Sequence, residues 1–181
     1  MFNVGALGGT SLSFDDHGHA TKITIQRHGK TLALVDKLDA RITKSKRPRD
    51  VFTPEDFPQA ESFALESWGR GCVQVLTGGQ RSWEVYQSSA DAREACLSWI
   101  RVSYSLEAPT AWRLTVAECL ATVQHGEDYI TIQCADRAAL RVSSAQPLAY
   151  ETLSEKGKIT GVAVTVQLPQ GDSSVELVVE S

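Results

Sequence analysis

The sequence lacks the features that mark membrane-spanning, secreted or disulfide-rich proteins. It contains no apolar run of about 18 residues, so no segment is expected to span a membrane as a helix. Its first residues carry neither the basic nor the long apolar segment of a secretory signal, which predicts a cytoplasmic protein. The four cysteines form no C-x-x-C pair, which favours buried thiols over a disulfide or zinc framework.

Common signatures of catalysis are also missing. The chain has no G-x-S-x-G, H-E-x-x-H or phosphate-loop pattern. Asp15, Asp16, His17 and His19 form the densest group of metal-ligating residue types. Such a cluster between two strands is more typical of a solvated turn, with a metal site as the alternative. We therefore predict a protein that is not an enzyme and has no catalytic residue, no cofactor and no bound metal.

The composition is that of a folded globular protein. The chain has 181 residues, of which 42% are apolar and 22% charged, which is enough for a packed core and an ordinary polar surface. A formal net charge of −4 argues against nucleic-acid binding by the molecule as a whole. The length allows one domain of ordinary size or two small ones.

Strand-like alternation of apolar and polar residues dominates the chain. Residues 21–36 are expected to form a hairpin that bends at Gly29, with Ile23 and Ile25 on one face. The remaining expected strands are short and separated by glycine-containing or polar breaks. They cover residues 11–14, 62–67, 72–77, 82–87, 112–123, 129–134, 139–143, 159–168 and 174–179.

One helix is expected to interrupt this pattern, at about residues 89–104. Ser88 and Asp91 resemble a capping box, with aspartate at the position where glutamate is usual. Cys96, Trp99 and Ile100 would share one face of this helix. We expect that face to pack against the open end of the preceding strands.

The stretch from 61 to 104 resembles the C-terminal half of a pleckstrin homology (PH) domain. Phe63 matches the phenylalanine that leads one of the family's strands, and residues 81–86 match its last strand. Trp99 and Ile100 match the tryptophan and the following aliphatic residue of the family's capping helix. The similar part covers about a quarter of the chain.

The PH-like resemblance implies both a fold and a function. The fold is mainly β: a PH-like bent antiparallel barrel capped by one C-terminal helix over residues 1–106, followed by a second antiparallel β unit over 107–181. The implied function is protein–protein interaction or scaffolding in an intracellular assembly such as a cytoskeletal one. Recruitment to membranes through a phosphoinositide is the alternative.

A basic, proline-containing segment, expected to be an exposed loop, is the clearest candidate for a binding surface. It concentrates positive charge in an otherwise acidic chain, so its expected partner is an acidic protein surface or a phosphoinositide head group. A solvated loop without a partner is the alternative, and base stacking is not expected because no aromatic residues interleave. The candidates are Arg41, Lys44, Lys46, Arg47 and Arg49, with Lys22, Arg27 and Lys30 of the first hairpin.

A second resemblance lies near the N-terminus. Residues 5–9, 14–16 and 22–25 are similar to the opening of a jacalin-type lectin, over about 30 residues. This resemblance implies carbohydrate binding as a further functional alternative. The helix expected at 89–104 argues against it, because that lectin family has no helix.

Overall fold

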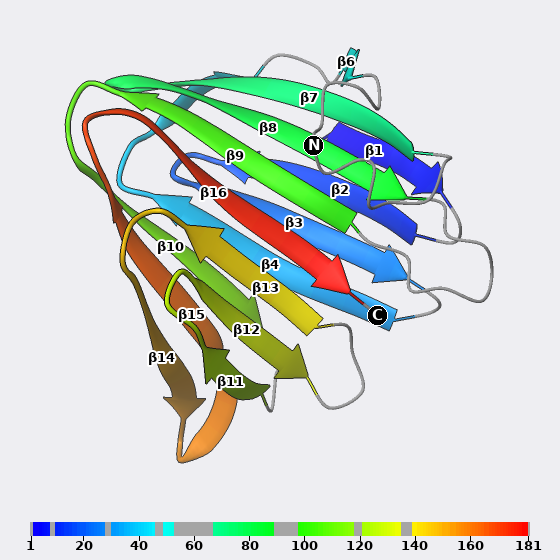
Figure 1. Cartoon of the computed structure of the whole chain (residues 1–181), viewed down its shortest axis with the longest axis vertical. Helices are drawn as coiled ribbons and strands as arrows, with labels where there is room; N and C mark the ends of the chain where they lie inside the picture. The colour runs from blue at the N-terminus through cyan, green and yellow to red at the C-terminus, as the bar shows by residue number, and fades with distance from the viewer. Residues whose placement is uncertain are drawn as a thin grey trace.

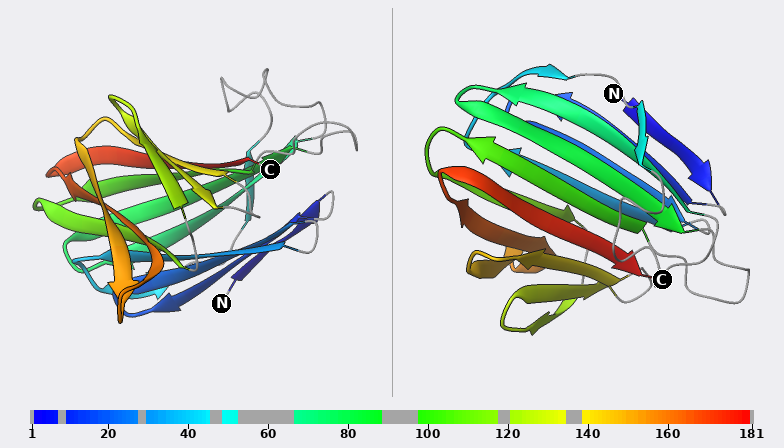
Figure 2. Two further views of the ribbon diagram at one scale, coloured as in Figure 1. Left: turned by 90° about the horizontal axis from the view of Figure 1, so that it is seen from below. Right: turned by 45° about the horizontal axis from the view of Figure 1, so that its top comes forward.

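The chain folds into two antiparallel β-sheets that stack face to face (Figures 1 and 2). The structure is a computed structural model, and it describes residues 2–7, 10–27, 30–45, 49–52, 67–88, 98–117, 121–134 and 139–180. No helix among these residues has the length and hydropathy needed to span a bilayer.

Sheet A has seven strands and is built from both ends of the chain. Its first four strands follow one another as neighbours, and three strands from the second half of the chain complete it. In spatial order they are β1 (Phe2–Leu7), β2 (Thr10–His17), β3 (Ala20–Arg27), β4 (Lys30–Leu38), β10 (Thr110–Ala117), β15 (Lys158–Leu168) and β14 (Leu148–Glu155).

Sheet B has nine strands and covers one face of sheet A (Figure 2). Its central strands are the long ones, and short strands lie at both edges. In spatial order they are β11 (Ala121–His125), β12 (Tyr129–Cys134), β13 (Ala139–Ser144), β16 (Gly171–Glu180), β9 (Ser98–Leu106), β8 (Gly79–Ser88), β7 (Ser67–Leu76) and β5 (Ile42–Ser45), with β6 (Arg49–Phe52) also paired to β7.

The hydrophobic core lies between the two sheets. Successive side chains of a strand point to opposite faces, so buried residues alternate with more exposed ones along the central strands β9 and β10. Trp112, Leu114 and Val116 of β10 are buried from sheet A, and Ile100 and Val102 of β9 from sheet B. The intervening residues form the two outer faces of the sandwich, where ligands have access.

The prediction of a mainly β chain is confirmed, but the helix is wrong over residues 98–104. That stretch belongs to β9, which pairs with β8 on one side and β16 on the other. Ile100, Val102 and Tyr104 alternate with a period of two, which the helical interpretation overlooked. Residues 89–97 and Phe63 lie outside the described residues, and Trp99 lies in β9.

The described strands form two stacked sheets, and no barrel capped by a helix is seen among them. The expected boundary after residue 106 breaks neither sheet, because β4 pairs with β10 and β9 pairs with β16. Strands from both expected units therefore share each sheet. The argument against a jacalin-type protein depended on that helix, so it fails over residues 98–104, and the resemblance itself stays a prediction.

Several of the expected strands are confirmed. The hairpin predicted at 21–36 is the β3–β4 pair, and the strands predicted at 129–134 and 159–168 are β12 and β15. The single strand expected at 112–123 is two strands, β10 and β11, and β14 was not foreseen. The basic segment is also more regular than expected, because parts of it form β5 and β6.

Candidate functional site

A groove of about 710 Å³ crosses the outer face of sheet A, over β4, β10, β15 and β14. The strand register aligns one residue from each strand across it. Lys37 lies opposite Arg113, Arg113 lies opposite Thr165, and Thr165 lies opposite Ala149. The polar side chains of this row alternate with the buried residues of the same strands, so the core orients them outward.

Small residues leave room for a ligand beside the charged ones. Ala111 and Ala149 line the groove, and His19, Asp39 and Gln167 add polar groups to its wall. His19 belongs to the turn between β2 and β3, and its carbonyl oxygen accepts a hydrogen bond from the Leu38 amide at 2.9 Å. This bond ties the turn to the end of β4 beside the groove.

The groove combines cationic donors with neutral and acidic hydrogen-bonding groups. Lys37 is exposed, and Nη1 of Arg113 lies 2.7 Å from Oε1 of Glu151 on β14. An arginine guanidinium and a lysine ammonium are suited to bind carboxylate or sulfate oxygens. Asp39 and Gln167 can bind hydroxyl groups. The arrangement therefore suits a ligand that carries both anionic groups and hydroxyls, as acidic sugars do.

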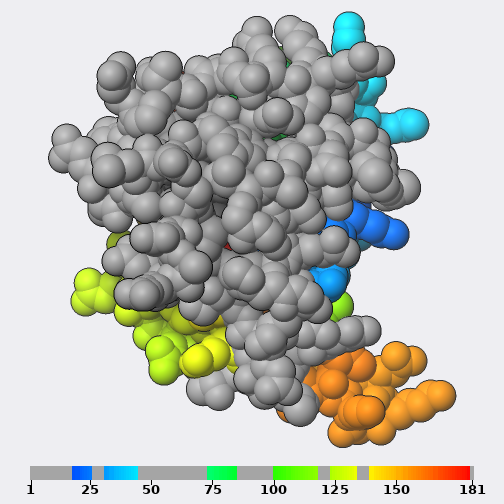
Figure 3. All heavy atoms as spheres, turned by 90° about the vertical axis from the view of Figure 1, so that its right-hand side faces the viewer, coloured from blue at the N-terminus to red at the C-terminus, as the bar shows by residue number. Residues whose placement is uncertain are grey.

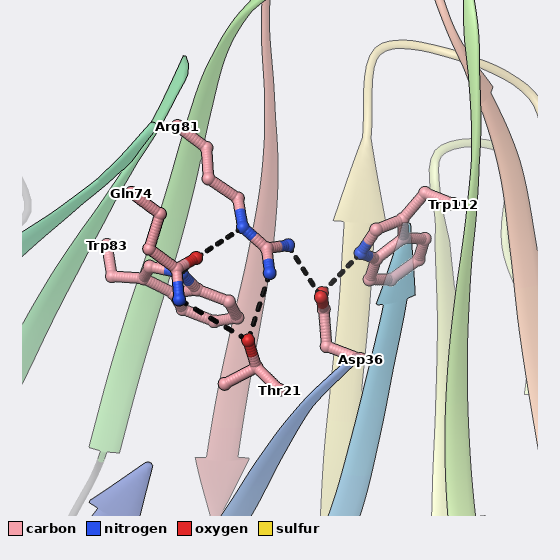
Figure 4. A network of polar contacts seen from close by, with 6 residues as sticks. All are labelled: Thr21, Asp36, Gln74, Arg81, Trp83 and Trp112. Atoms are coloured by element: carbon pink, nitrogen blue, oxygen red, sulfur yellow. Dashed lines mark hydrogen bonds and ion pairs between the residues drawn. The ribbon is translucent and has the colours of Figure 1, made fainter. Parts of the chain in front are cut away.

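A buried polar network joins the two sheets beneath the groove (Figure 4). Arg81 of β8 donates from Nη1 to Oδ1 of Asp36 at 2.5 Å, and both side chains are fully buried. Trp112 of β10 donates from Nε1 to the other carboxylate oxygen of Asp36, also at 2.5 Å. Asp36 and Trp112 directly adjoin the groove residues Lys37 and Arg113 in sequence, so the network stabilises the strands that carry them.

The other two guanidinium nitrogens of Arg81 also donate hydrogen bonds. Its Nε donates to Oε1 of Gln74 at 2.5 Å, and its Nη2 donates to Oγ1 of Thr21 at 3.0 Å. Nε1 of Trp83 donates to the same Gln74 oxygen at 2.6 Å, and the guanidinium carbon of Arg81 lies 4.8 Å from the centroid of the Trp83 ring. The buried charge is therefore paired and hydrogen-bonded by residues from both sheets.

The charges of this network act on the proton affinities inside the core. Burial by itself would lower the pKa of Arg81, but the Asp36 carboxylate outweighs it and the pKa is raised. Burial raises the pKa of the Tyr104 phenol, and the Asp36 carboxylate adds to this effect. Arg81 therefore stays charged and Tyr104 stays neutral in the folded protein.

A second hollow, of about 540 Å³, lies on sheet B. Ser82 of β8 lies opposite Ser103 of β9, which lies opposite Ser174 of β16, so three hydroxyl-bearing residues form a row. Asp172 is the charged residue among those that line it, and no described cation does. This hollow therefore provides fewer favourable interactions for an anionic ligand than the groove on sheet A does.

The structure describes three of the five basic residues of the 41–49 segment, and they lie along one edge of sheet B. Arg41 is exposed and its amide donates to Oγ1 of Thr77 at 2.9 Å, while Lys44 is an exposed residue of β5. Arg49 lies in β6, and Lys46 and Arg47 lie outside the described residues. The expectation of one continuous loop is therefore corrected, because β5 and β6 both pair with β7 at the edge of sheet B.

The hairpin residues proposed with that segment lie on sheet A. Lys22 is exposed on β3, where it pairs with Val35 of β4. Arg27 and Lys30 face each other at the ends of β3 and β4. Neither Lys22 nor Arg41 nor Lys44, the predicted residues whose side chains the structure describes, lines the groove, and Lys37 and Arg113, which do, were not singled out from the sequence.

Among the described residues, no group of three or more His, Cys, Asp or Glu side chains is arranged to hold a metal ion. Asp15, Asp16 and His17 belong to β2, so the solvated turn expected there begins only at Gly18. His19 lines the groove. His125 lies elsewhere, with its ring centroid 6.1 Å from that of Tyr150, where the edge strands β11 and β14 of the two sheets approach each other.

The groove residues leave a partial signal in the sequence. Alternation within 31–38 and 110–117 is enough to place Lys37 and Arg113 on the polar sides of their strands. The two residues are distant in the chain, and only the pairing of β4 with β10 makes them neighbours. No local pattern encodes that pairing.

Comparison with known proteins gives a likeness of fold. No protein-family model and no curated protein matches this sequence. A crystal structure of heparan sulfate lyase HepC from Pedobacter heparinus is similar over 99% of this chain, with a TM-score of 0.51 and 8% sequence identity. A mutant of the same lyase gives a TM-score of 0.49 and 8% identity over the same share. This chain spans 36% of the length of the lyase chain.

This likeness corrects the functional prediction. Intracellular scaffolding was inferred from a PH-like barrel with a capping helix, and β9 occupies part of the place of that helix. The similar solved structure with a TM-score of 0.51 is a heparan sulfate lyase. The scaffolding interpretation, including its cytoskeletal form, is therefore wrong, and the phosphoinositide alternative gains no support.

Proposed function

We propose that this chain binds an acidic polysaccharide in the groove on the outer face of sheet A. The observation that carries the proposal is the pairing of Lys37 with Arg113 in adjacent strands, in a groove widened by Ala111 and Ala149. Two cations at this spacing suit the uronate or sulfate groups of such a chain. Asp39 and Gln167 supply partners for the hydroxyls between them.

The fold likeness supports the same class of ligand. The solved structure with a TM-score of 0.51 is a heparan sulfate lyase, and heparan sulfate is a polymer with both carboxylate and sulfate groups. This chain spans 36% of the length of that lyase, so we propose that it binds the polysaccharide, with cleavage as the alternative. Cleavage by a lyase forms an unsaturated sugar, which absorbs in the ultraviolet, so one sample reports both outcomes.

The test is calorimetric titration of the chain with a heparan sulfate oligosaccharide and with a neutral glucan of equal length. We expect binding of the acidic oligosaccharide and little binding of the glucan. Lys37→Gln combined with Arg113→Gln removes two charge-assisted contacts, each worth about 1.5 kcal/mol or more, so affinity should fall by about one hundred-fold. The melting temperature should change little, because Lys37 is exposed and the Arg113–Glu151 pair lies at the surface.

The matched control is Lys44→Gln combined with Lys156→Gln. Both lysines are exposed and lie outside the groove, so this pair removes the same charge from other parts of the surface. An equal loss of affinity in both double variants would show nonspecific attraction. Absence of binding by the wild-type chain would reject the proposal, and a rise in ultraviolet absorbance would replace it with cleavage.

A further inference from the structure

We infer that Glu151 competes with ligands for Arg113. This competition makes the groove selective for ligands that bring their own carboxylate or sulfate to Arg113. The inference rests on the proposed function and adds a specificity-determining residue to it. Glu151 does not line the groove, yet it holds the arginine that does.

The Arg113–Glu151 ion pair spans β15. Arg113 belongs to β10 and Glu151 to β14, the two strands that flank β15 in sheet A. Arg113 lies opposite Thr165, and Glu151 lies opposite Ala163, so all these residues share the outer face. Ala163 has no exposed surface although it lies on this face, as expected if the two longer side chains close over it.

The contact is weak enough for a ligand to replace it. The side chain of Arg113 is 39% exposed and that of Glu151 is 57% exposed. Exposed ion pairs contribute little to stability because water and salt compete with them. The hairpin of β14 and β15 projects from the body of the molecule (Figure 3), and β14 is the edge strand that carries Glu151. The exposed Glu151 carboxylate can therefore remain hydrated when a ligand displaces it.

This arrangement discriminates against neutral sugars. A hydroxyl that reaches Arg113 must compete with a carboxylate already held at 2.7 Å, and it offers a weaker acceptor in exchange. A ligand carboxylate or sulfate replaces one anion with another and keeps the guanidinium paired. Glu151 thus lowers the affinity for every ligand, and it lowers that for neutral ligands most.

The test compares Glu151→Gln with Glu155→Gln in calorimetric titrations with a heparan sulfate hexasaccharide. Glu155 is exposed on the same strand, so its substitution removes the same charge without releasing Arg113. We expect Glu151→Gln to tighten binding about two- to five-fold, which corresponds to the weight of an exposed ion pair. Glu155→Gln should change affinity by less than half of this.

A double-mutant cycle separates release of Arg113 from a general change of charge. When Arg113 is already glutamine, Glu151→Gln should no longer tighten binding. The inference is overturned if Glu151→Gln matches the wild type or Glu155→Gln, or if its gain persists without Arg113. In each of these outcomes the wild-type chain still binds, so the proposed function stands. If neither the wild-type chain nor any variant binds the hexasaccharide, the proposed function and this inference are both rejected.

Discussion

Replacing Asp36 with alanine tests whether the buried network holds the two sheets together. Asp36 is the carboxylate that faces Arg81, and neither side chain has any exposed surface. The substitution leaves a guanidinium in the core with Gln74 and Thr21 as its remaining hydrogen-bond partners in the network. It also removes the acceptor of the Trp112 indole.

The expected cost follows from these two losses. Removing one partner of a buried ion pair costs about 3–5 kcal/mol, because the other charge remains buried without compensation. The orphaned indole N–H adds to this cost, by about 1 kcal/mol or more if no water reaches it. For a domain of this length, a loss of about 3–5 kcal/mol lowers the melting temperature by about 6–20 °C.

Urea unfolding followed by tryptophan fluorescence measures this change, because Trp83 and Trp112 both lie in the network. The control is Glu84→Ala, which removes the partner of Arg101 at 2.7 Å in a pair that is only partly buried. That substitution should cost about 1 kcal/mol or less. Asp36→Leu combined with Arg81→Met removes both charges and should be much milder than Asp36→Ala.

A small effect would refute the reasoning. If Asp36→Ala costs no more than Glu84→Ala, water or a shift of Arg81 relieves the buried charge, and the network does not hold the sheets in place. If the double replacement is as harmful as Asp36→Ala, the loss comes from packing or from the orphaned Trp112 indole, and the buried charge is not its cause.

Two further substitutions test the core. The hydroxyl of Tyr104 is buried without a hydrogen-bond partner among the described residues, so Tyr104→Phe should leave the free energy of unfolding unchanged or raise it by about 1 kcal/mol in urea titrations. The raised pKa of Tyr104 means that only the unfolded chain loses the phenol proton above pH about 10, so the stability of the folded protein should fall above that pH. Tyr104→Phe should make this fall smaller in melting curves recorded from pH 8 to about 11. A Cβ on Gly161 would lie 2.3 Å from the carbonyl oxygen of Val116, so Gly161→Ala should lower the unfolding free energy by about 1–3 kcal/mol, and an unchanged urea midpoint would contradict the register of β10 with β15.

The hairpin at 21–36 and the strands at 129–134 and 159–168 were predictable because their signal is local. Alternation of apolar and polar residues reports which side chains face a core, and it does so within six to ten residues. The same signal was present in Ile100, Val102 and Tyr104 of β9. It was overlooked because Ser88 and Asp91 match a capping pattern, and such a pattern carries no information about neighbouring strands.

The candidate site was only half predictable. The sequence indicates that Lys37 and Arg113 are polar residues on the solvent side of their strands. It does not indicate that they are adjacent. Sheet A brings β4 beside β10, although the sheet B strands β5 to β9 lie between them in the chain. The basic segment at 41–49 has its charges close together in the chain, whereas the groove draws its charges from separate strands.

The sequence by itself determined that the chain is mainly β, which residues of most strands face the core, and that the surface is mixed in charge. Tertiary structure alone decided which strands are neighbours, and therefore the two-sheet sandwich, the groove and the buried Arg81–Asp36 contact across 45 residues. The physical reason is that side-chain alternation is a property of a single strand. Strand pairing depends on the free energy of burying all the faces together, and many pairings satisfy the same local pattern.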